Sequence, residues 1–279
     1  MTGTLYLCAT PIGNLGDITK RVLDTLSSAD IIAAEDTRHT LALLNHFNIK
    51  KPLISYYEHN KEKRGGEIIA LLKEGKSVAL VTDAGTPGIS DPGSDIAALC
   101  HEEGICVTSL PGACAVITAL SLSGLMSGRF VFEGFLPLDK KEKAAVLKSL
   151  EAEKRTVIFY EAPHRLIKTL LELKSFAGER RVALARELTK KYEEIRFDSI
   201  DGHIAHFEET KPKGEFVIIV EGMPVSDIKK EEVAKWAEIS IEEHFDMYIK
   251  EGLDEKEAMK RTAKDRGISK REVYARLKE

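Results

Sequence analysis

The chain has 279 residues, of which 43% are hydrophobic and 31% are charged, and its formal net charge is −4. This length suggests about two domains, and the small negative charge excludes a general electrostatic attraction to nucleic acid or an anionic membrane. The four cysteines show neither paired C-x-x-C spacing nor a matching histidine set, which argues against zinc and against a disulfide framework. The N-terminus lacks the pattern of a signal peptide or membrane span. We therefore expect a cytoplasmic protein without a metal site or a membrane partner.

Short β-rich runs alternate with helix-length amphipathic segments in the first part of the chain, which is typical of βαβ units and a parallel sheet. The expected strands are residues 5–10, 31–35, 53–57, 77–82 and 106–110. The expected helices are residues 18–28, 40–47, 63–75 and 94–104. We assign residues 1–112 to an N-terminal α/β domain.

A second series of strands and helices follows, and we assign it to a second α/β domain, residues 113–224. The expected strands are residues 129–135, 156–162, 181–187, 193–200 and 214–222, and the expected helices are residues 140–154 and 164–174. Polar and apolar residues alternate in the strand at 193–200, so we expect this sheet to be mixed or partly antiparallel. Residues 111–125 are expected to form a helix that links the two domains.

Residues 225–279 contain no strand-like run and are assigned to a small helical unit. Its last part, residues 256–279, carries nine Lys and Arg against four Asp and Glu, hence a net charge of +5. The pattern predicts a helix, a turn at 266–268, and a second helix with Ser269 as its N-cap. Such a helix-turn-helix suits a nucleic-acid backbone, although a solvated helical hairpin fits the same residues.

The stretch DAGTPGISDPG, residues 83–93, follows an expected strand, where open α/β sheets bind ligands. A Walker A loop is excluded because Ala70 stands where the first glycine is required, and the glycine spacing does not fit a dinucleotide fingerprint. An adenosyl-type cofactor, held by backbone groups and by Asp83, remains possible. The alternative is a turn in which Asp83 and Asp91 cap neighbouring amides.

Eight stretches in chain order carry a family resemblance: ATPIGNLGDIT, AEDTRHT, SYYEHN, DAGTPGISDPG, PGACAVITALSLSG, FEGFLP, FYEAPHR and ARELTKKYEE. They resemble the ribosomal RNA small-subunit methyltransferase I family, the 2′-O-ribose methyltransferase branch of the S-adenosylmethionine-dependent tetrapyrrole methylases. The resemblance covers residues 4–222, and the tail is also similar. It implies two α/β domains of tetrapyrrole-methylase type with a cofactor cleft between them, a small C-terminal helical unit, and a homodimer.

The resemblance also implies which residues contact S-adenosylmethionine. They lie in the N-terminal proline loop, the glycine loop, the segment after the Pro-Gly turn, and strand ends of the second domain: Pro11, Gly13, Asp83, Ala84, Gly85, Ile89, Ser90, Cys114, Ala115, Tyr160 and Ala185. One departure separates the chain from corrin chemistry. Tetrapyrrole methylases usually carry Gly-Asp-Pro in the central loop, where this chain has Asp-Ala-Gly followed by Thr-Pro.

Methyl transfer to a ribose hydroxyl requires a group that accepts the hydroxyl proton. The candidate catalytic residues are Asp36, Arg38, Glu161, His164 and Glu187. The wider set of acids and histidines adds Glu35, His39, Glu58 and His59. Asp36 is also a sound helix N-cap, and His164 could equally open the helix that follows it. No single base stands out from the sequence.

The expected function is S-adenosylmethionine-dependent 2′-O-methylation of a cytidine ribose in 16S ribosomal RNA, with the RNA of the small ribosomal subunit as partner. One alternative is a small-molecule methylase of the tetrapyrrole type, against which the basic tail and the altered central loop both count. Another is a non-catalytic RNA-binding assembly factor that keeps the cofactor fold.

Overall fold

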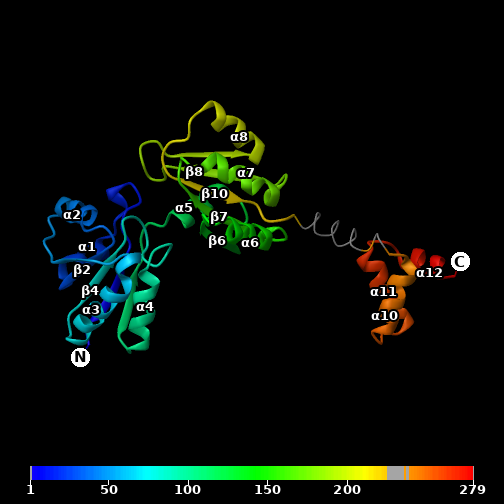
Figure 1. Ribbon diagram of the computed structural model, residues 1–279, viewed down its shortest axis with the longest axis horizontal. Coiled ribbons are helices and arrows are strands. Elements are labelled where there is room, and N and C mark those ends of the chain that lie inside the picture. The colour runs from blue at the N-terminus through cyan, green and yellow to red at the C-terminus, as the bar shows by residue number, and fades with distance from the viewer. Residues whose placement is uncertain (1, 225–235, 237–238, 279) are drawn as a thin grey trace.

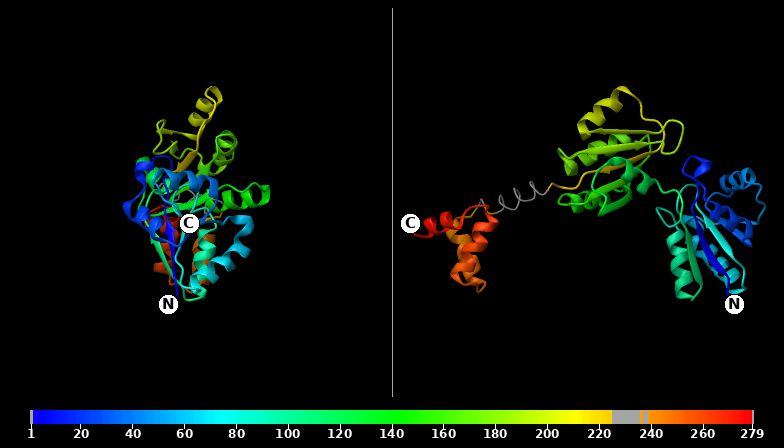
Figure 2. Two further views of the ribbon diagram at one scale, coloured as in Figure 1. Left: turned by 90° about the vertical axis from the view of Figure 1, so that its left-hand side faces the viewer. Right: turned by 180° about the vertical axis from the view of Figure 1, so that it is seen from behind.

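The computed structural model describes residues 2–224, 236 and 239–278. Within them, two five-stranded sheets are formed by consecutive parts of the sequence and are followed by C-terminal helices (Figure 1). Figure 2 shows from two further sides that each sheet has its own covering helices. Residues 225–235, 237 and 238, which open the expected C-terminal unit, lie outside the described residues.

The first sheet has the strand order β3-β2-β4-β1-β5, and all its pairings are parallel, as predicted. Its strands are β1 (Thr4–Cys8), β2 (Ile31–Ala34), β3 (Leu53–Ser55), β4 (Val78–Val81) and β5 (Cys106–Leu110). Its helices are α1 (Lys20–Ser28), α2 (Thr37–His46), α3 (Lys61–Lys73) and α4 (Gly93–Glu102), with short 3-10 turns η1 (Leu15–Asp17) and η2 (Glu58–Asn60).

This sheet is covered on both faces, which explains the uninterrupted apolar run of β4. One core cluster joins Leu5 to Ile68 of α3 and Ile96 of α4. The other joins Cys8 to Leu26 of α1 and Leu44 of α2. Because the strands are parallel, their carboxyl ends lie at one edge of the sheet. The loops after β1, β2 and β4 lie together there and are joined by hydrogen bonds.

The second sheet has the order β6-β7-β10-β8-β9 and is mixed, as predicted, because only β6 and β7 pair in parallel. Its strands are β6 (Phe130–Phe135), β7 (Thr156–Glu161), β8 (Val182–Arg186), β9 (Glu194–Asp198) and β10 (Phe216–Val220). Its helices are α5 (Ala115–Ser123), α6 (Lys140–Leu150), α7 (Leu166–Ala177) and α8 (Ile200–Glu209). Every residue of the central strand β10 is buried.

Three sequence-based expectations need correction in this half. Helix α8 was not predicted; Ser199 caps it by accepting a hydrogen bond from the Gly202 amide. The linking helix α5 covers less than the expected 111–125, because residues 111–114 are not helical and Gly124, with a φ of 59°, ends it. His164 does not open α7, which begins at Leu166.

The C-terminal helices are α10 (Ile241–Lys250), α11 (Glu255–Asp265) and α12 (Lys270–Leu277), which pack on one another. The predicted turn is confirmed: Gly267 adopts a φ of 64° between α11 and α12. Ser269 caps α12 and forms a capping box with Glu272. Arg266 donates to the carbonyl oxygens of Ile239 and Ser240, both at 2.6 Å, and so ties the turn to the start of α10.

Candidate functional site

A cavity of about 590 Å³ is lined by residues of both sheets' lobes. The first lobe contributes the glycine loop after β4 and Glu35 at the end of β2. The second contributes the start of α5, the end of β7, and the loops beside β8 and β10. The volume of the cavity falls within the range of roughly 300 to 1,000 Å³ that small-molecule sites occupy.

The glycine loop is fastened to the N-terminal loop by main-chain hydrogen bonds. The Thr10 amide donates to the Gly85 carbonyl at 2.8 Å, and the Gly85 amide donates back to Thr10 at 3.1 Å. Gly85 has a φ of 89°, and a Cβ there would come within 3.4 Å of Ile12 Cγ2. Glycine is needed here because the left-handed region is disfavoured for residues with a side chain.

The second half of the loop is held by Asp91. Its carboxylate accepts from the Gly88 amide at 2.8 Å and from the Gly93 amide at 2.8 Å. The hydroxyl of Tyr56, which follows β3, also donates to the Pro92 carbonyl of the loop at 3.1 Å. These bonds fix Ser90 in the cavity wall with a φ of 70°, a backbone conformation that residues with side chains adopt rarely. The loop is therefore a braced turn that also forms one wall of the cavity.

Aromatic residues form the wall of the second lobe. Tyr160, on β7, packs edge-on against Phe132 and Phe135 with ring centroids 4.9 and 5.7 Å apart. Burial raises the pKa of the Tyr160 hydroxyl to about 12, so the phenol stays neutral. Cys114 lies beside it at the N-cap position of α5. This wall can pack against an apolar or aromatic ligand group.

Carboxylates dominate the charged lining of the cavity. Glu35 accepts a hydrogen bond from the Thr82 hydroxyl at 2.8 Å, and Asp83 accepts one from the Asp36 amide at 3.0 Å. The fully buried Glu161 carboxylate is held by the Ala162 amide, the Thr169 hydroxyl and Arg165, whose Nε lies 3.4 Å away. Glu161 is therefore engaged by protein donors, whereas Glu35 and Asp83 each have one such bond among those found in the structure.

Eight of the eleven residues expected to contact the cofactor line this cavity. They are Asp83, Ala84, Gly85, Ile89, Ser90, Cys114, Ala115 and Tyr160. The other three lie close by but outside the lining: Pro11 is buried, Ala185 is buried on β8 beside Val217, and Gly13 lies against Lys190.

The five expected catalytic residues are not brought together. Asp36 caps α2 and pairs with Arg38, whose hydrogen bonds hold the pKa of the Asp36 carboxyl well below its usual range. Glu161 lines the cavity, and His164 is exposed in the turn before α7. Glu187 supports the loop after β8, where its carboxylate accepts from Lys190 and from the Glu215 amide.

Several residues that line the cavity were not expected from the sequence. They include Ile12, Phe135, Lys190 and Glu215. Lys190 belongs to the stretch ARELTKKYEE, which carried the resemblance, so its position within that stretch was an available signal. Glu215 could not have been found this way, because its place in the lining depends on how the start of β10 lies against the loop after β8.

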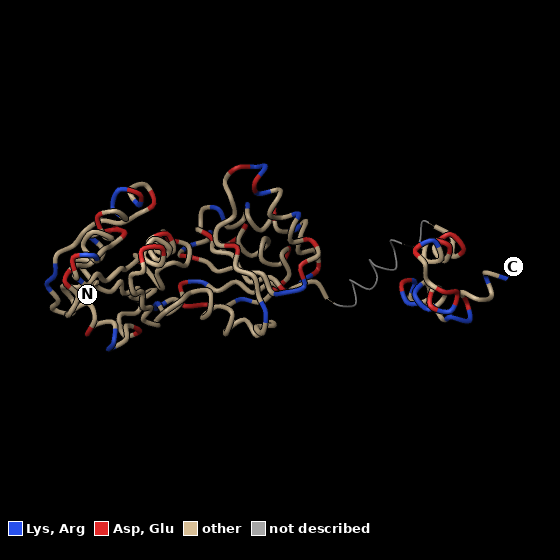
Figure 3. Tube along the Cα trace, turned by 90° about the horizontal axis from the view of Figure 1, so that it is seen from below, with Lys and Arg blue, Asp and Glu red and all other residues tan. Residues whose placement is uncertain are grey.

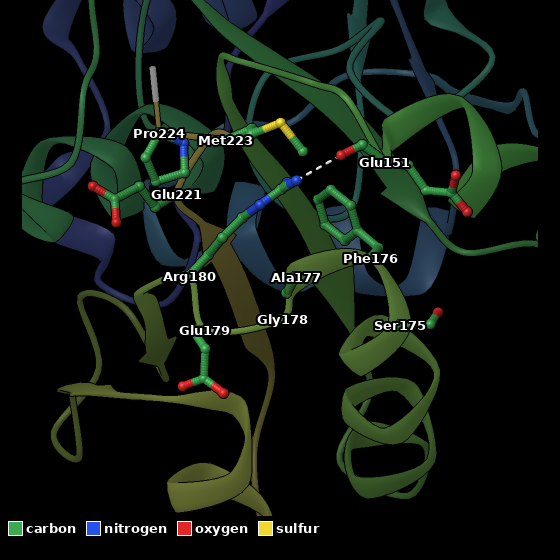
Figure 4. Close-up of a pocket in the computed structure, with 10 residues that line it drawn as sticks. All are labelled: Glu151, Ser175, Phe176, Ala177, Gly178, Glu179, Arg180, Glu221, Met223 and Pro224. Atoms are coloured by element: carbon green, nitrogen blue, oxygen red, sulfur yellow. Dashed lines mark hydrogen bonds between the residues drawn. The ribbon is translucent and has the colours of Figure 1, made fainter. Parts of the chain in front are cut away.

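A second cavity of about 470 Å³ lies within the second lobe, near the C-terminal ends of α6 and α7 (Figure 4). Arg180 extends across it, donates to the Glu151 carbonyl at 2.6 Å and lies 4.8 Å from the centroid of the Phe176 ring. None of the expected site residues lines it. Arg180 here ties two helix ends together, which is a structural role.

In the part of the chain that the structure describes, no cluster of His, Cys, Asp and Glu side chains could hold a metal ion. Among the same residues, no helix has the length and apolar character needed to cross a membrane.

Comparison with known proteins identifies close relatives. The family model for Tetrapyrrole (Corrin/Porphyrin) Methylases matches residues 4–202. Ribosomal RNA small subunit methyltransferase I of Bacillus subtilis (strain 168) is 49% identical over 272 residues, which cover 98% of this chain and 93% of the relative. The protein of the same name from Haemophilus influenzae is 45% identical over 277 residues, with 98% and 96% covered.

Solved structures share the fold at lower identity. Diphthine synthase superposes with a TM-score of 0.63 at 15% identity, covering 79% of this chain and 90% of that one. Uroporphyrin-III C-methyltransferase from Thermus thermophilus, in complex with S-adenosylhomocysteine, superposes with a TM-score of 0.55 at 15% identity, covering 78% and 97%. The expected tetrapyrrole-methylase fold is thereby confirmed.

Proposed function

Because this chain belongs to the ribosomal RNA small subunit methyltransferase I family of the tetrapyrrole methylases, we propose that it 2′-O-methylates a cytidine ribose in 16S ribosomal RNA. It is a methyltransferase that uses S-adenosylmethionine. The observation that carries the proposal is the acidic cavity between the two lobes, bordered by the bare main chain of the glycine loop.

The residues of the cavity fit this cofactor. When bound, S-adenosylmethionine supplies a methyl group activated on a positively charged sulfur. Two of the lining carboxylates, Glu161 and Asp91, are occupied by Arg165 and by loop amides. Glu35 and Asp83 remain to favour a cationic ligand. The main chain of residues 83–86 can approach the ligand closely, and the Tyr160 wall gives it an apolar surface.

We assign proton acceptance to Glu35, which was one of the wider set of candidates. Its half-buried carboxylate lines the cavity and is oriented by the Thr82 hydroxyl. A positioned carboxylate can take the proton of a poorly nucleophilic hydroxyl as the methyl group is transferred. The expected outcome for Glu35→Gln is a loss of kcat of at least about a hundredfold at saturating cofactor, as for removal of a general base. Cofactor affinity should fall only about tenfold, as for Asp83→Asn, because one carboxylate charge is lost while the amide keeps the acceptor for Thr82.

The C-terminal helices are proposed to contact the RNA. Lys270, Arg271 and Tyr274 are exposed on α12, and Lys278 Nζ lies 4.7 Å from the centroid of the Tyr274 ring. Basic segments recur along these helices in Figure 3. Basic side chains contact phosphates, and an exposed aromatic ring can stack on an unpaired base.

A cytoplasmic homodimer is also part of the proposal. Exposed apolar side chains gather on and after α5, where Ile117 is 50%, Leu122 43% and Met126 68% exposed. Burying such a surface against a second copy would remove it from water. Light scattering that gave the mass of a single chain at micromolar concentration would contradict the dimer.

The test of function uses labelled S-adenosylmethionine and small ribosomal subunits from a strain that lacks the enzyme. Label on a 2′-O-methylcytidine after nuclease digestion supports the proposal. Label on a tetrapyrrole alone would favour the small-molecule alternative, and cofactor binding without any transfer would favour an assembly factor.

A further inference from the structure

Lys190 is the only Lys or Arg among the described residues that line the main cavity. Its Nζ lies 2.9 Å from Glu187 Oε1 and 2.8 Å from Glu215 Oε2. We call these three residues the rim cluster. The other charged residues in the lining are carboxylates, so Lys190 is the place in the lining where an anionic ligand group is favoured.

The two carboxylates of the rim cluster differ in how firmly they are held. The Glu187 side chain is 22% exposed and also accepts the Glu215 amide at 3.0 Å. The Glu215 side chain is 80% exposed, and Lys190 is the one partner found for its carboxylate among the described residues. Glu187 is therefore a fixed part of the loop, whereas Glu215 can turn away into water at small cost.

The position of Lys190 is fixed from two sides. A Cβ on Gly13 of the first lobe would lie 2.3 Å from Lys190 Cγ, so the lysine stem lies directly against the N-terminal loop. In its own loop, Glu187 and Thr189 have φ values of 51° and 65°, which residues with side chains rarely adopt. Such conformations persist where the surrounding structure fixes them, and they gather at ligand sites.

We propose that Lys190 binds a phosphodiester oxygen of the RNA next to the acceptor ribose, and that Glu215 occupies this position in the free protein. This inference rests on the proposed function. A ribose that enters the cavity is flanked by RNA phosphates, and the carboxylates of the lining repel them. A cation at the rim, beside the bound ribose, offsets this repulsion. The exposed Glu215 carboxylate then exchanges for the phosphate, while Glu187 keeps Lys190 in place.

The test compares Lys190→Gln, Lys190→Arg, Glu215→Gln and the double variant, with Lys191→Gln as a control. Lys191 is the neighbouring exposed lysine outside the cavity lining, so its replacement removes the same charge. The KM for small subunits is measured at saturating cofactor, and the cofactor Kd is measured separately by calorimetry.

Lys190→Gln is expected to raise the KM about tenfold, with Lys190→Arg restoring most of it. The slope of log KM against log salt should become shallower by about 0.7, the loss of one phosphate contact on single-stranded RNA. Glu215→Gln is expected to lower the KM about threefold because a competing anion is removed, and to have no effect in the double variant. Lys191→Gln should change the KM less than twofold.

A rise in KM for Glu215→Gln would overturn the proposal, because it would make Glu215 a support rather than a competitor. A tenfold loss of cofactor affinity in Lys190→Gln, with the salt slope unchanged, would overturn it in favour of the cofactor carboxylate as the ligand. If the wild-type protein transfers no methyl group to subunits, the proposed function fails. Filter binding of subunits to the same variants then tests the role of Lys190: the Kd for subunits should rise in Lys190→Gln and fall in Glu215→Gln.

Discussion

Replacing Gly85 by Ala separates the two roles of the glycine loop. Gly85 has a φ of 89°, and Gly88, in the same loop, has a φ of 87°. A Cβ on Gly85 would meet Ile12 Cγ2 at 3.4 Å, and one on Gly88 would meet the Ser94 amide at 3.5 Å, so neither substitution forces a severe clash. Each should therefore cost mainly backbone strain, about 1–2 kcal/mol of unfolding free energy, or roughly 2–8 °C in Tm.

The two variants should differ in cofactor binding. Gly85 lines the cavity and its methyl group would be directed toward Ile12, another lining residue, whereas Gly88 is not part of the lining. Calorimetric titration with S-adenosylmethionine should show at least a tenfold loss of affinity for Gly85→Ala, about 1.4 kcal/mol, and less than a twofold loss for Gly88→Ala. Equal losses in both variants would refute the cavity contact and leave loop strain as the cause.

Three further predictions concern charge, helix propensity and the tail. Asp83→Asn keeps an oxygen for the Asp36 amide but removes the charge, so cofactor affinity should fall about tenfold with little change in Tm; unchanged affinity would remove the electrostatic account of the cavity. Gly66→Ala, at an exposed position inside α3 with no atom within 4 Å of the new Cβ, should stabilise by about 0.5–1 kcal/mol in urea unfolding, and a loss of stability would contradict the helix. Deleting residues 256–279 should weaken RNA binding, with the cofactor Kd unchanged; equal RNA affinity would assign the contact elsewhere.

The parallel sheet was predictable because local sequence sets it. Continuous apolar runs such as β4, separated by amphipathic helices, leave few alternatives to βαβ units. Helix α8 was missed because its first residue, Ile200, continues the alternation of β9 and Gly202 weakens the helix pattern. Ser199 as a cap and the spacing of Ile200, Ile204 and Phe207 were the available signals.

Most of the residues expected to contact the cofactor line one cavity, whereas the expected catalytic residues do not share a site. Short motifs report on main-chain loops such as 83–93, whose shape is set by neighbouring residues. The roles of charged side chains depend on partners far along the chain. Glu35 is engaged by Thr82, 47 residues later, and Lys190 is engaged by Glu215, 25 residues later. Spacing alone does not reveal such pairings, so Asp36, Arg38, His164 and Glu187 remain predictions without a shared site.

The chain passes between the two sheets once, in the turn from β5 to α5. Each sheet has core clusters of its own, and the lobes meet through contacts such as that of Gly13 with Lys190. A cut in that turn would give two fragments that each retain a complete sheet. Expressed separately, they would make a split enzyme whose reassembly reports on the methyl donor, because the cavity proposed to bind the donor is lined by residues of both fragments.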